Sequence, residues 1–317
     1  MLEIKFTYVG IDVSKGFLDL SVFAESSRHK NTPAGVRSIV KLLKKTCPAN
    51  APALVVAEAT SCYHRTLLKI LQKAGVAYFL INPKRARDFA RSIGKLAKTD
   101  TIDAAMLAQV GEAQRLMPQA APPENVEQLR DLLSLREHLI SNLRGWKARK
   151  KQDLGSISAR YCKVEIGHLE TRIKKLETEI DALIQADETL AERRRLMVEV
   201  QGIGDLTAAS MLGWMPELGT LSKKTAPALL GVCPYNCDSG GMRGLRKCYG
   251  GRFRARTSLY MASLSAARFN EELAPFYKRL VAEGKSVKKA RVAVMRKLII
   301  HLNTVLKDAP HPEFVIS

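Results

Sequence analysis

Long apolar segments are missing from this sequence. Its 317 residues contain no run of about 18 apolar residues, so no transmembrane helix is expected. The first residues, Met-Leu-Glu-Ile-Lys, lack the apolar core of a signal peptide. Six cysteines do not suggest a disulfide scaffold in a chain of this length. We therefore expect a protein of a reducing, cytoplasmic compartment.

Acidic residues are too few to balance the basic ones. The chain has 51 Lys and Arg against 31 Asp and Glu, which gives a formal net charge of +20. Such an excess causes costly self-repulsion unless a polyanion neutralises it. Nucleic acid is the leading candidate for that polyanion, and a membrane surface comes second. The length allows two or three domains with cores of their own.

Residues 1–118 carry alternating strand and helix patterns. Two apolar runs in Tyr8–Val22 flank Ser14-Lys15-Gly16, which is a turn signal, and so predict a hairpin of two strands. Further strand patterns at Ala53–Ala57 and Val76–Ile81 alternate with helix patterns at 35–45, at 61–74 and from Thr99 onward. This order predicts an α/β domain with a mixed sheet.

Residues 119–195 predict long helices. A Pro/Ala/Gln linker at 118–123 precedes two helical patterns, 125–151 and 164–195, with a break near Gly155. The second pattern has apolar residues at three- and four-residue spacing: Ile166, Leu169, Ile173, Leu176, Ile180 and Leu183, then Leu190 after an interruption at Asp187. This seam fits a coiled coil between chains and a helical hairpin within one chain equally well.

Residues 196–317 predict a third, mainly helical region. Gly202-Ile203-Gly204 is typical of a helix-hairpin-helix, in which Gly202 and Gly204 let backbone N–H groups approach a phosphate. A plain corner between two helices is the alternative. The segment from Ser239 to Arg256 holds five glycines and six cations without an acid. Ser286–Leu306 predicts a final amphipathic helix.

Four acids of the first region form a candidate metal site. Asp12 lies in the first strand, Glu58 ends a later strand, and Asp100 and Asp103 start a helix three residues apart, hence on one face. Carboxylates that share a pocket need cations between them, and hard oxygen ligands suit Mg²⁺ or Mn²⁺. Unrelated structural or capping acids, with Asp100 as an N-cap, are the alternative. The upstream cations that would hold a polyanion are Lys84, Arg85, Arg87 and Arg91.

These motifs resemble those of the DEDD insertion-sequence transposases, the family of bridge-RNA-guided recombinases. The resemblance rests on Gly10-Ile11-Asp12-Val13-Ser14-Lys15, on Glu58, on Lys98-Thr99-Asp100-Thr101-Ile102-Asp103-Ala104, and then on Gly202-Ile203-Gly204, the segment 231–240 and Gly250-Gly251-Arg252. It implies three domains. These are a RuvC-like, ribonuclease-H-type catalytic domain over 1–118, a helical linker or coiled coil over 119–195, and a transposase domain over 196–317.

The resemblance also implies a serine nucleophile, because the family's catalytic serine corresponds to Ser239. By composition alone, Asp238-Ser239-Gly240-Gly241 would be an ordinary turn. An activated serine hydroxyl can attack a DNA phosphate while arginines stabilise the charge on the phosphoryl oxygens. Tyr235 and Tyr249 are rival nucleophiles without a family match. The residues expected to bind nucleic acid here are Arg243, Arg246, Lys247, Arg252 and Arg254.

The expected function is Mg²⁺-dependent, site-specific DNA recombination or transposition by an insertion sequence. The resemblance implies donor and target DNA, a noncoding guide RNA and a dimer of dimers, with no membrane partner. It also implies a bacterial or archaeal cytoplasm and action at the nucleoid. The alternatives are a structure-selective nuclease that uses water, such as a junction resolvase, a DNA invertase of the same family, and a non-enzymatic binding protein. A zinc site on Cys233, Cys237 and Cys248 is disfavoured because a fourth ligand is missing nearby.

Overall fold

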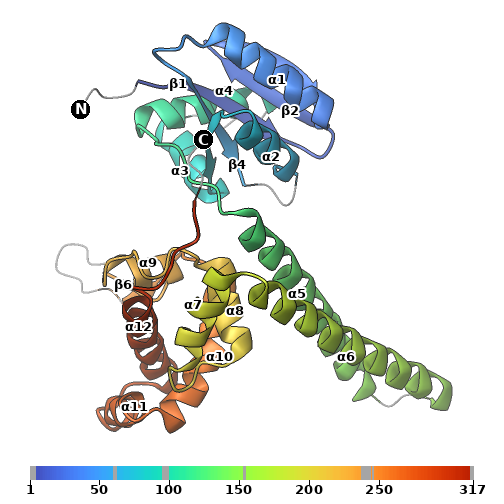
Figure 1. Cartoon of the computed structure of the whole chain (residues 1–317), viewed down its shortest axis with the longest axis vertical. Helices are drawn as coiled ribbons and strands as arrows, with labels where there is room; N and C mark the ends of the chain where they lie inside the picture. The colour runs from blue at the N-terminus through green and yellow to red at the C-terminus, as the bar shows by residue number, and fades with distance from the viewer. Residues whose placement is uncertain are drawn as a thin grey trace. The chain divides into compact units, whose positions relative to one another are not determined.

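The protein consists of an α/β unit and a helical unit (Figure 1). The structure is a computed structural model that describes residues 5–59, 63–94, 100–152, 155–236, 244 and 246–314, with the backbone alone for 100–102. The first unit comprises Met1–Ala121 with Phe314–Ser317, and the second comprises Pro122–Glu313. None of the described helices is long and apolar enough to cross a membrane. The division into three domains stays a prediction.

The first unit is built on a five-stranded mixed sheet with the strand order β3-β2-β1-β4-β5. The strands are β1 (Thr7–Val13), β2 (Phe17–Val22), β3 (Glu25–Lys30), β4 (Ala53–Glu58) and β5 (Ala77–Ile81). Consecutive strands among β1, β2 and β3 pair antiparallel, whereas β1, β4 and β5 pair parallel. The mixed sheet, the hairpin and the two later strands are confirmed. The prediction omits β3 because Glu-Ser-Ser-Arg-His-Lys has no apolar alternation and is largely exposed.

Helices cover both faces of this sheet (Figure 1). They are α1 (Pro33–Thr46), α2 (Arg65–Lys73), α3 (Pro83–Ser92) and α4 (Asp100–Ala113). Ile39 of α1 and Leu71 of α2 share a core with one face, whereas Leu107 of α4 shares a second core with Val56 on the opposite face. The predicted helix at 35–45 is confirmed as α1. The helix predicted over 61–74 corresponds to α2, which begins at Arg65; Ser61, where the predicted helix begins, lies outside the described residues.

Helix α4 lies directly against strand β1 at Gly10. A Cβ built on Gly10 would be 1.8 Å from the carbonyl oxygen of Ala104, so only glycine permits this approach. Beyond the other end of α4, the Tyr8 hydroxyl donates a hydrogen bond to the carbonyl oxygen of Leu116 over 3.1 Å. The first turns of α4 therefore lie toward the carboxyl end of β1.

Gly10→Ala is expected to destabilise the first unit strongly, because the new methyl group would overlap the backbone of α4. We expect the free energy of unfolding to fall by about 3 kcal/mol or more, at the upper end of the range for overpacked cores. Gly16→Ala is the matched control in the turn of the same hairpin. A Cβ there meets nothing within 4 Å, so its effect should be about 0.5 kcal/mol or less. Urea unfolding measures both variants, and equal stability would contradict the close packing.

The second unit is mainly helical, with one short ribbon of strands. Its elements are α5 (Glu124–Lys150), α6 (Ser156–Gln185), α7 (Glu188–Val198), α8 (Asp205–Trp214), α9 (Thr225–Leu230), β6 (Pro234–Tyr235), β7 (Lys247–Cys248), α10 (Phe253–Phe269), α11 (Leu273–Ala282) and α12 (Val287–Val305). One hydrophobic core runs from Val126 on α5 to Ala309 near the C-terminus. The predicted final helix is confirmed as α12.

Helices α5 and α6 form a hairpin within the chain (Figure 1). Residues of the predicted seam, such as Ile173 and Ile180, are buried in it, so the alternative of an intrachain hairpin is present. Pairing between chains stays a prediction. The single helix expected over 164–195 is wrong, because α6 begins at Ser156 and ends at Gln185. Asp187 then starts α7 by accepting a hydrogen bond from the Leu190 N–H over 2.8 Å, as an N-cap does.

A buried arginine joins three parts of the second unit. Arg193 on α7 is fully buried and donates hydrogen bonds to the carbonyl oxygens of Pro216 (3.1 Å), Leu218 (2.7 Å) and Pro310 (3.2 Å). Burial lowers the pKa of this guanidinium to about 10, which still leaves it charged at neutral pH. These bonds stabilise the charge and fix α7 to the loop after α8 and to the C-terminal segment.

Candidate catalytic site and nucleic-acid interface

Two of the predicted acids end neighbouring parallel strands. The pairing of β1 with β4 ends at Ile11 and Ala57. Asp12 is the next residue on β1, and Glu58 is the next residue on β4. Alternate residues of a strand point to the same face, so Asp12 shares the face on which Gly10 meets α4. By the same rule Glu58 shares the face of Val56, which packs in the core with α4. Both carboxylates therefore lie at one edge of the sheet, on its α4 side.

Asp103 comes to the same edge from α4. It immediately precedes Ala104, the residue whose carbonyl oxygen approaches Gly10. It also lies three and four residues before Met106 and Leu107, which are buried against the sheet, so it shares their helical face. Asp12, Glu58 and Asp103 are all partly exposed. The side chain of Asp100 lies outside the described residues.

The chemistry of these donors suits a divalent cation, because carboxylate oxygens are the ligands that Mg²⁺ and Mn²⁺ prefer. Among the residues that the structure describes, no group of three or more His, Cys, Asp or Glu side chains is arranged to hold a metal ion. Cys233 and Cys248 are free cysteines, and Cys237 lies outside the described residues. The structure thus brings three acids to one edge, and their assignment as metal ligands stays a prediction.

Asp19 is an acid at this edge that the sequence analysis missed. It lies on β2 directly opposite Asp12, so the two side chains share a face. Asp19 is only 7% exposed, and Arg28 of β3 donates to both of its carboxylate oxygens over 2.8 and 3.1 Å. Arg28 thereby offsets the charge of one of two adjacent carboxylates. The available signal was a single acid within the apolar strand Phe-Leu-Asp-Leu-Ser-Val.

The predicted cations of α3 are displayed on the surface of the first unit. Asn82 caps this helix by accepting a hydrogen bond from the Lys84 N–H over 2.9 Å, and Ala86 is its buried residue. Arg85 hydrogen-bonds to Gln114, and Arg91 lies 3.9 Å from Asp88. The side chains of all four predicted cations are exposed: Lys84, Arg85, Arg87 and Arg91. They are available to a polyanion.

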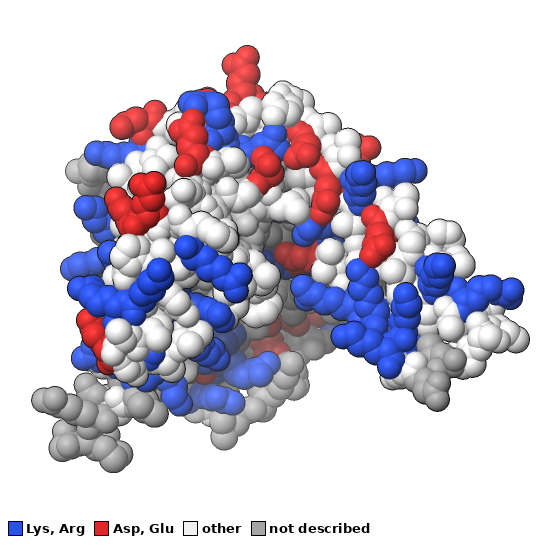
Figure 2. Space-filling model, turned by 90° about the horizontal axis from the view of Figure 1, so that it is seen from below, with Lys and Arg blue, Asp and Glu red and all other residues white. Residues whose placement is uncertain are grey.

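A second basic surface lies at the end of the α5–α6 hairpin (Figure 2). The sequence between residues 144 and 164 contains a single acid, Asp153. Lys147 forms an ion pair with Glu170 over 2.7 Å. The sequence analysis did not single out this surface, because its cations come from two helices that meet only in the fold. The exposed cations are Arg144, Lys147, Arg149, Lys150, Lys151, Arg160 and Lys163.

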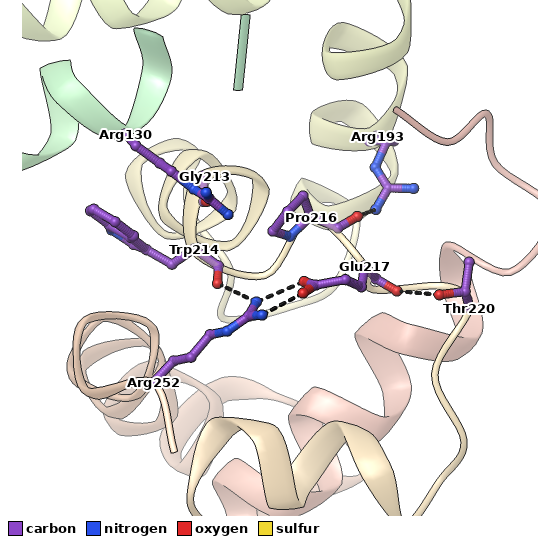
Figure 3. Close-up of polar contacts among 8 residues, drawn as sticks. All are labelled: Arg130, Arg193, Gly213, Trp214, Pro216, Glu217, Thr220 and Arg252. Carbon is purple, nitrogen blue, oxygen red and sulfur yellow. Dashed lines mark hydrogen bonds and ion pairs between the residues drawn. The ribbon is translucent and has the colours of Figure 1, made fainter. Parts of the chain in front are cut away.

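Arg252, a predicted nucleic-acid contact, is engaged within the second unit (Figure 3). At the start of α10, its guanidinium donates to both carboxylate oxygens of Glu217 and, over 2.7 Å, to the carbonyl oxygen of Trp214. Arg130 donates to the neighbouring carbonyl oxygen of Gly213 over 2.6 Å. A phosphate that binds Arg252 would therefore have to compete with Glu217.

The other predicted cations of this region differ in their surroundings. Arg254 lies 3.2 Å from the Glu137 carboxylate, and its guanidinium carbon is 4.5 Å from the centre of the Trp214 ring. Arg246 and Lys247 are exposed. Arg243 and Ser239 lie outside the described residues. Of the cations described here, Arg246 and Lys247 are the ones most open to a nucleic-acid backbone.

The pair of Glu217 and Arg252 makes stability depend on pH. Burial tends to raise the pKa of the Glu217 carboxyl, but the hydrogen bonds and charge of Arg252, with a smaller contribution from Arg130, hold that pKa below its usual value of 4.5. A carboxyl with a lowered pKa in the folded state contributes stability above its unfolded pKa. That contribution is lost as the pH falls through the folded-state pKa.

Glu217→Gln is expected to lower the free energy of unfolding by about 1–3 kcal/mol at pH 7, because Arg252 loses its anionic partner. The difference from the parent protein should shrink as the pH falls below about 4.5 and through the lowered pKa of folded Glu217. Glu283→Gln is the control, since Glu283 pairs with Arg279 at an exposed site over 3.8 Å. Its effect should stay below about 0.5 kcal/mol. Urea unfolding of both variants and the parent, at pH 7 and at acidic pH, measures these differences. A destabilisation by Glu217→Gln that persists at acidic pH would contradict the role of the Glu217 charge.

The two glycines between α7 and α8, Gly202 and Gly204, differ in how closely other residues pack against them. Gly202 has a φ of +103°, and a Cβ there would lie 2.8 Å from the Cβ of Ala266 on α10. Packing therefore explains Gly202 without a phosphate. Gly204 directly precedes α8 and has open space around its missing Cβ, so it offers the room that a phosphate needs. The helix-hairpin-helix stays a prediction.

The chain matches two family models. One, described as a transposase of the DEDD type, covers residues 9–158, and the other, described as the transposase IS116/IS110/IS902 family, covers residues 194–278. The chain is also similar to pilin gene-inverting proteins. That of Moraxella bovis is 27% identical over 312 residues, which cover 95% of this chain and 96% of that protein. That of Moraxella lacunata is 26% identical with the same coverage.

Proposed function

Because the chain belongs to the IS116/IS110/IS902 family of transposases, we propose that it cuts and rejoins DNA at specific sites through a phosphoserine intermediate. The protein is a DNA recombinase or transposase enzyme. The observation that supports the proposal is that Asp12 and Glu58 lie at the carboxyl ends of neighbouring parallel strands, on the face covered by α4, which carries Asp103. These acids come from three separate elements, β1, β4 and α4, as the ligands of one metal site often do.

Asp12, Glu58, Asp100 and Asp103 would hold Mg²⁺ or Mn²⁺ in this proposal. The family suggests dependence on a divalent metal, and the donor set is the appropriate one. When bound, such ions would stabilise the charge of the phosphoryl group under attack. The strand order is β3-β2-β1-β4-β5, in which the first three strands of the chain pair antiparallel and β4 and β5 add in parallel to β1. This topology supports a RuvC-like, ribonuclease-H-type fold for the first unit.

Ser239 is the proposed nucleophile. Its Oγ would bond to the phosphorus of a DNA phosphodiester as the bond from phosphorus to the sugar oxygen of the leaving strand breaks, and that oxygen would leave as a hydroxyl. Attack by a sugar hydroxyl of another strand would reverse these bond changes and release the serine. The phosphodiester energy is thereby retained for rejoining. The exposed cations Arg246 and Lys247, together with those of α3, would hold the DNA backbone.

The similarity to the two Moraxella proteins favours DNA inversion as the form of recombination, because both are named for inverting a pilin gene. Inversion and transposition need the same cutting and rejoining of strands. We extend the proposal to a noncoding guide RNA and a dimer of dimers. The net charge of +20 supports an RNA partner, since base pairing can carry sequence choice while the protein holds the backbone.

The decisive experiment is a search for the covalent linkage itself. The full-length protein, with RNA co-purified from its host and with Mg²⁺, is incubated with a plasmid that carries the DNA flanking its gene. The reaction is stopped with denaturant, digested with nuclease and protease, and examined by mass spectrometry. We expect a nucleotide on the peptide that contains Ser239. Strand breaks without a linked peptide would favour the junction-resolvase-like nuclease instead.

A further inference from the structure

The β6–β7 ribbon presents aromatic side chains to solvent. Tyr235 pairs with Lys247 across the ribbon, so these two side chains lie side by side on one face. Tyr249 directly follows the last residue of β7. The two tyrosines are 47% and 51% exposed.

Phe253 extends this surface at the start of α10, where it is 69% exposed. Arg256 connects it to the ribbon. The guanidinium carbon of Arg256 is 5.8 Å from the centre of the Phe253 ring, and its Nη1 donates to the carbonyl oxygens of Gly250 (2.6 Å) and Gly231 (3.3 Å). We call the surface of Tyr235, Lys247, Tyr249 and Phe253 the aromatic ribbon face.

The surroundings of the aromatic ribbon face are positively charged. Of the described cations between Asp238 and Glu271, Arg246 and Lys247 are exposed and Arg256 contacts both Gly250 and Phe253. Arg252 and Arg254 are paired with Glu217 and Glu137. Burial raises the pKa of the Cys248 thiol in the ribbon, and the nearby charges of Arg256 and Arg296 oppose that rise.

Exposed aromatic rings among cations fit an unpaired nucleotide better than other polyanions. A single exposed ring is ordinary on a protein surface, but here three exposed rings lie on the ribbon, directly after it and at the start of the following helix. In a DNA duplex the bases are already stacked on one another, so a duplex would use the cations and leave the rings without a partner. An unpaired base has free π-faces that stack on aromatic side chains, and its phosphate binds the cations.

We propose that the aromatic ribbon face stacks against unpaired bases of single-stranded DNA next to the phosphate that is cut, with Lys247 on the adjoining backbone. This inference rests on the proposed function, because strand exchange requires the DNA strands to separate near Ser239. Ser239 follows Tyr235 by four residues, so both would meet the same DNA strand. Tyr235 and Tyr249 then serve as stacking partners and not as nucleophiles.

The test is a titration of single-stranded DNA that carries the fluorescent base 2-aminopurine, with every protein in the Ser239→Ala background so that no cleavage interferes. We expect Tyr235→Ala, Tyr249→Ala and Phe253→Ala each to weaken binding by roughly 5- to 150-fold, the range for loss of one stacked base. Quenching of the fluorescence should fall in parallel. Tyr235→Phe and Tyr249→Phe keep the ring and should bind as the parent does. Affinity for a duplex of the same sequence should change little.

Phe269→Ala is the matched control. Phe269 is also 69% exposed and lies on the same helix, but sixteen residues from Phe253, which is about 24 Å along α10. Equal affinity of all alanine variants and this control would overturn the proposal. A larger loss with RNA than with DNA of the same sequence would overturn the assignment to DNA. Failure of the serine chemistry would show in the linkage assay alone, whereas failure of stacking would show in this titration alone.

Discussion

Ser239→Ala is expected to abolish DNA strand cleavage and the protein–DNA linkage together, by about 10³-fold or more, the scale on which loss of a nucleophile falls. The reason is that no other atom of the variant would accept the phosphoryl group. Cleavage is measured on a nicked plasmid substrate, and the linkage is measured by retention of DNA on denatured protein. DNA binding should remain within about two-fold of the parent, because an alanine removes no charge.

Ser265→Ala is the control for this variant, since Ser265 is an exposed serine on α10. It should cleave and link DNA as the parent does. Cleavage by Ser239→Ala without linkage would identify water as the nucleophile, and a linkage on the peptide of Tyr235 or Tyr249 would identify a tyrosine. Either result would overturn the assignment of Ser239.

Asp12→Asn is expected to reduce cleavage by about 10²-fold or more while DNA binding persists. An amide keeps the shape of the side chain but loses the negative charge that attracts a divalent cation. Asp12 lies opposite the buried Asp19, so the substitution also removes a repulsion between neighbouring carboxylates. Glu58→Gln and Asp103→Asn should behave alike.

The measurement is cleavage rate against Mg²⁺ and Mn²⁺ concentration, with thermal unfolding to show that each variant is folded. Glu112→Gln is the control, because Glu112 is an exposed acid near the other end of α4, nine residues from Asp103. Its metal dependence should match that of the parent. Full activity of folded Asp12→Asn at low Mg²⁺ would show that this edge of the sheet does not bind the metal.

Local sequence patterns predict the elements whose burial is regular. In α1, Val36, Ile39, Val40 and Leu43 recur at helical spacing and are the residues that the fold buries. β3 has no such pattern, because an edge strand with two solvated faces needs no apolar residues. The end of α6 also escapes prediction. The apolar spacing continues from Ile184 to Leu190 across the break, whereas the backbone stops at Gln185, where Asp187 caps the next helix.

The acids of the site are predictable to the extent that topology alone brings them together. Asp12 and Glu58 end adjacent parallel strands, so recognition of both strands is enough to pair them. The roles of Asp19 and Arg252 depend instead on partners that the sequence does not mark. Arg252 pairs with a glutamate 35 residues earlier in the loop after α8, and only the packing of α8 against α10 brings the two together. Charge counts alone would leave Arg252 free for DNA.

The number of residues between the β6–β7 ribbon and Ser239 limits the distance between the two. Four residues beyond Tyr235, even a fully extended chain spans no more than about 14 Å. Ser239 therefore lies within that distance of a residue that pairs in the β6–β7 ribbon. In the proposed mechanism, the phosphate that is cut must come within this distance of the ribbon. The path of the DNA along the ribbon then determines which phosphodiester bond is cut. Inserting glycines between Tyr235 and Ser239 should therefore allow cleavage at several neighbouring positions.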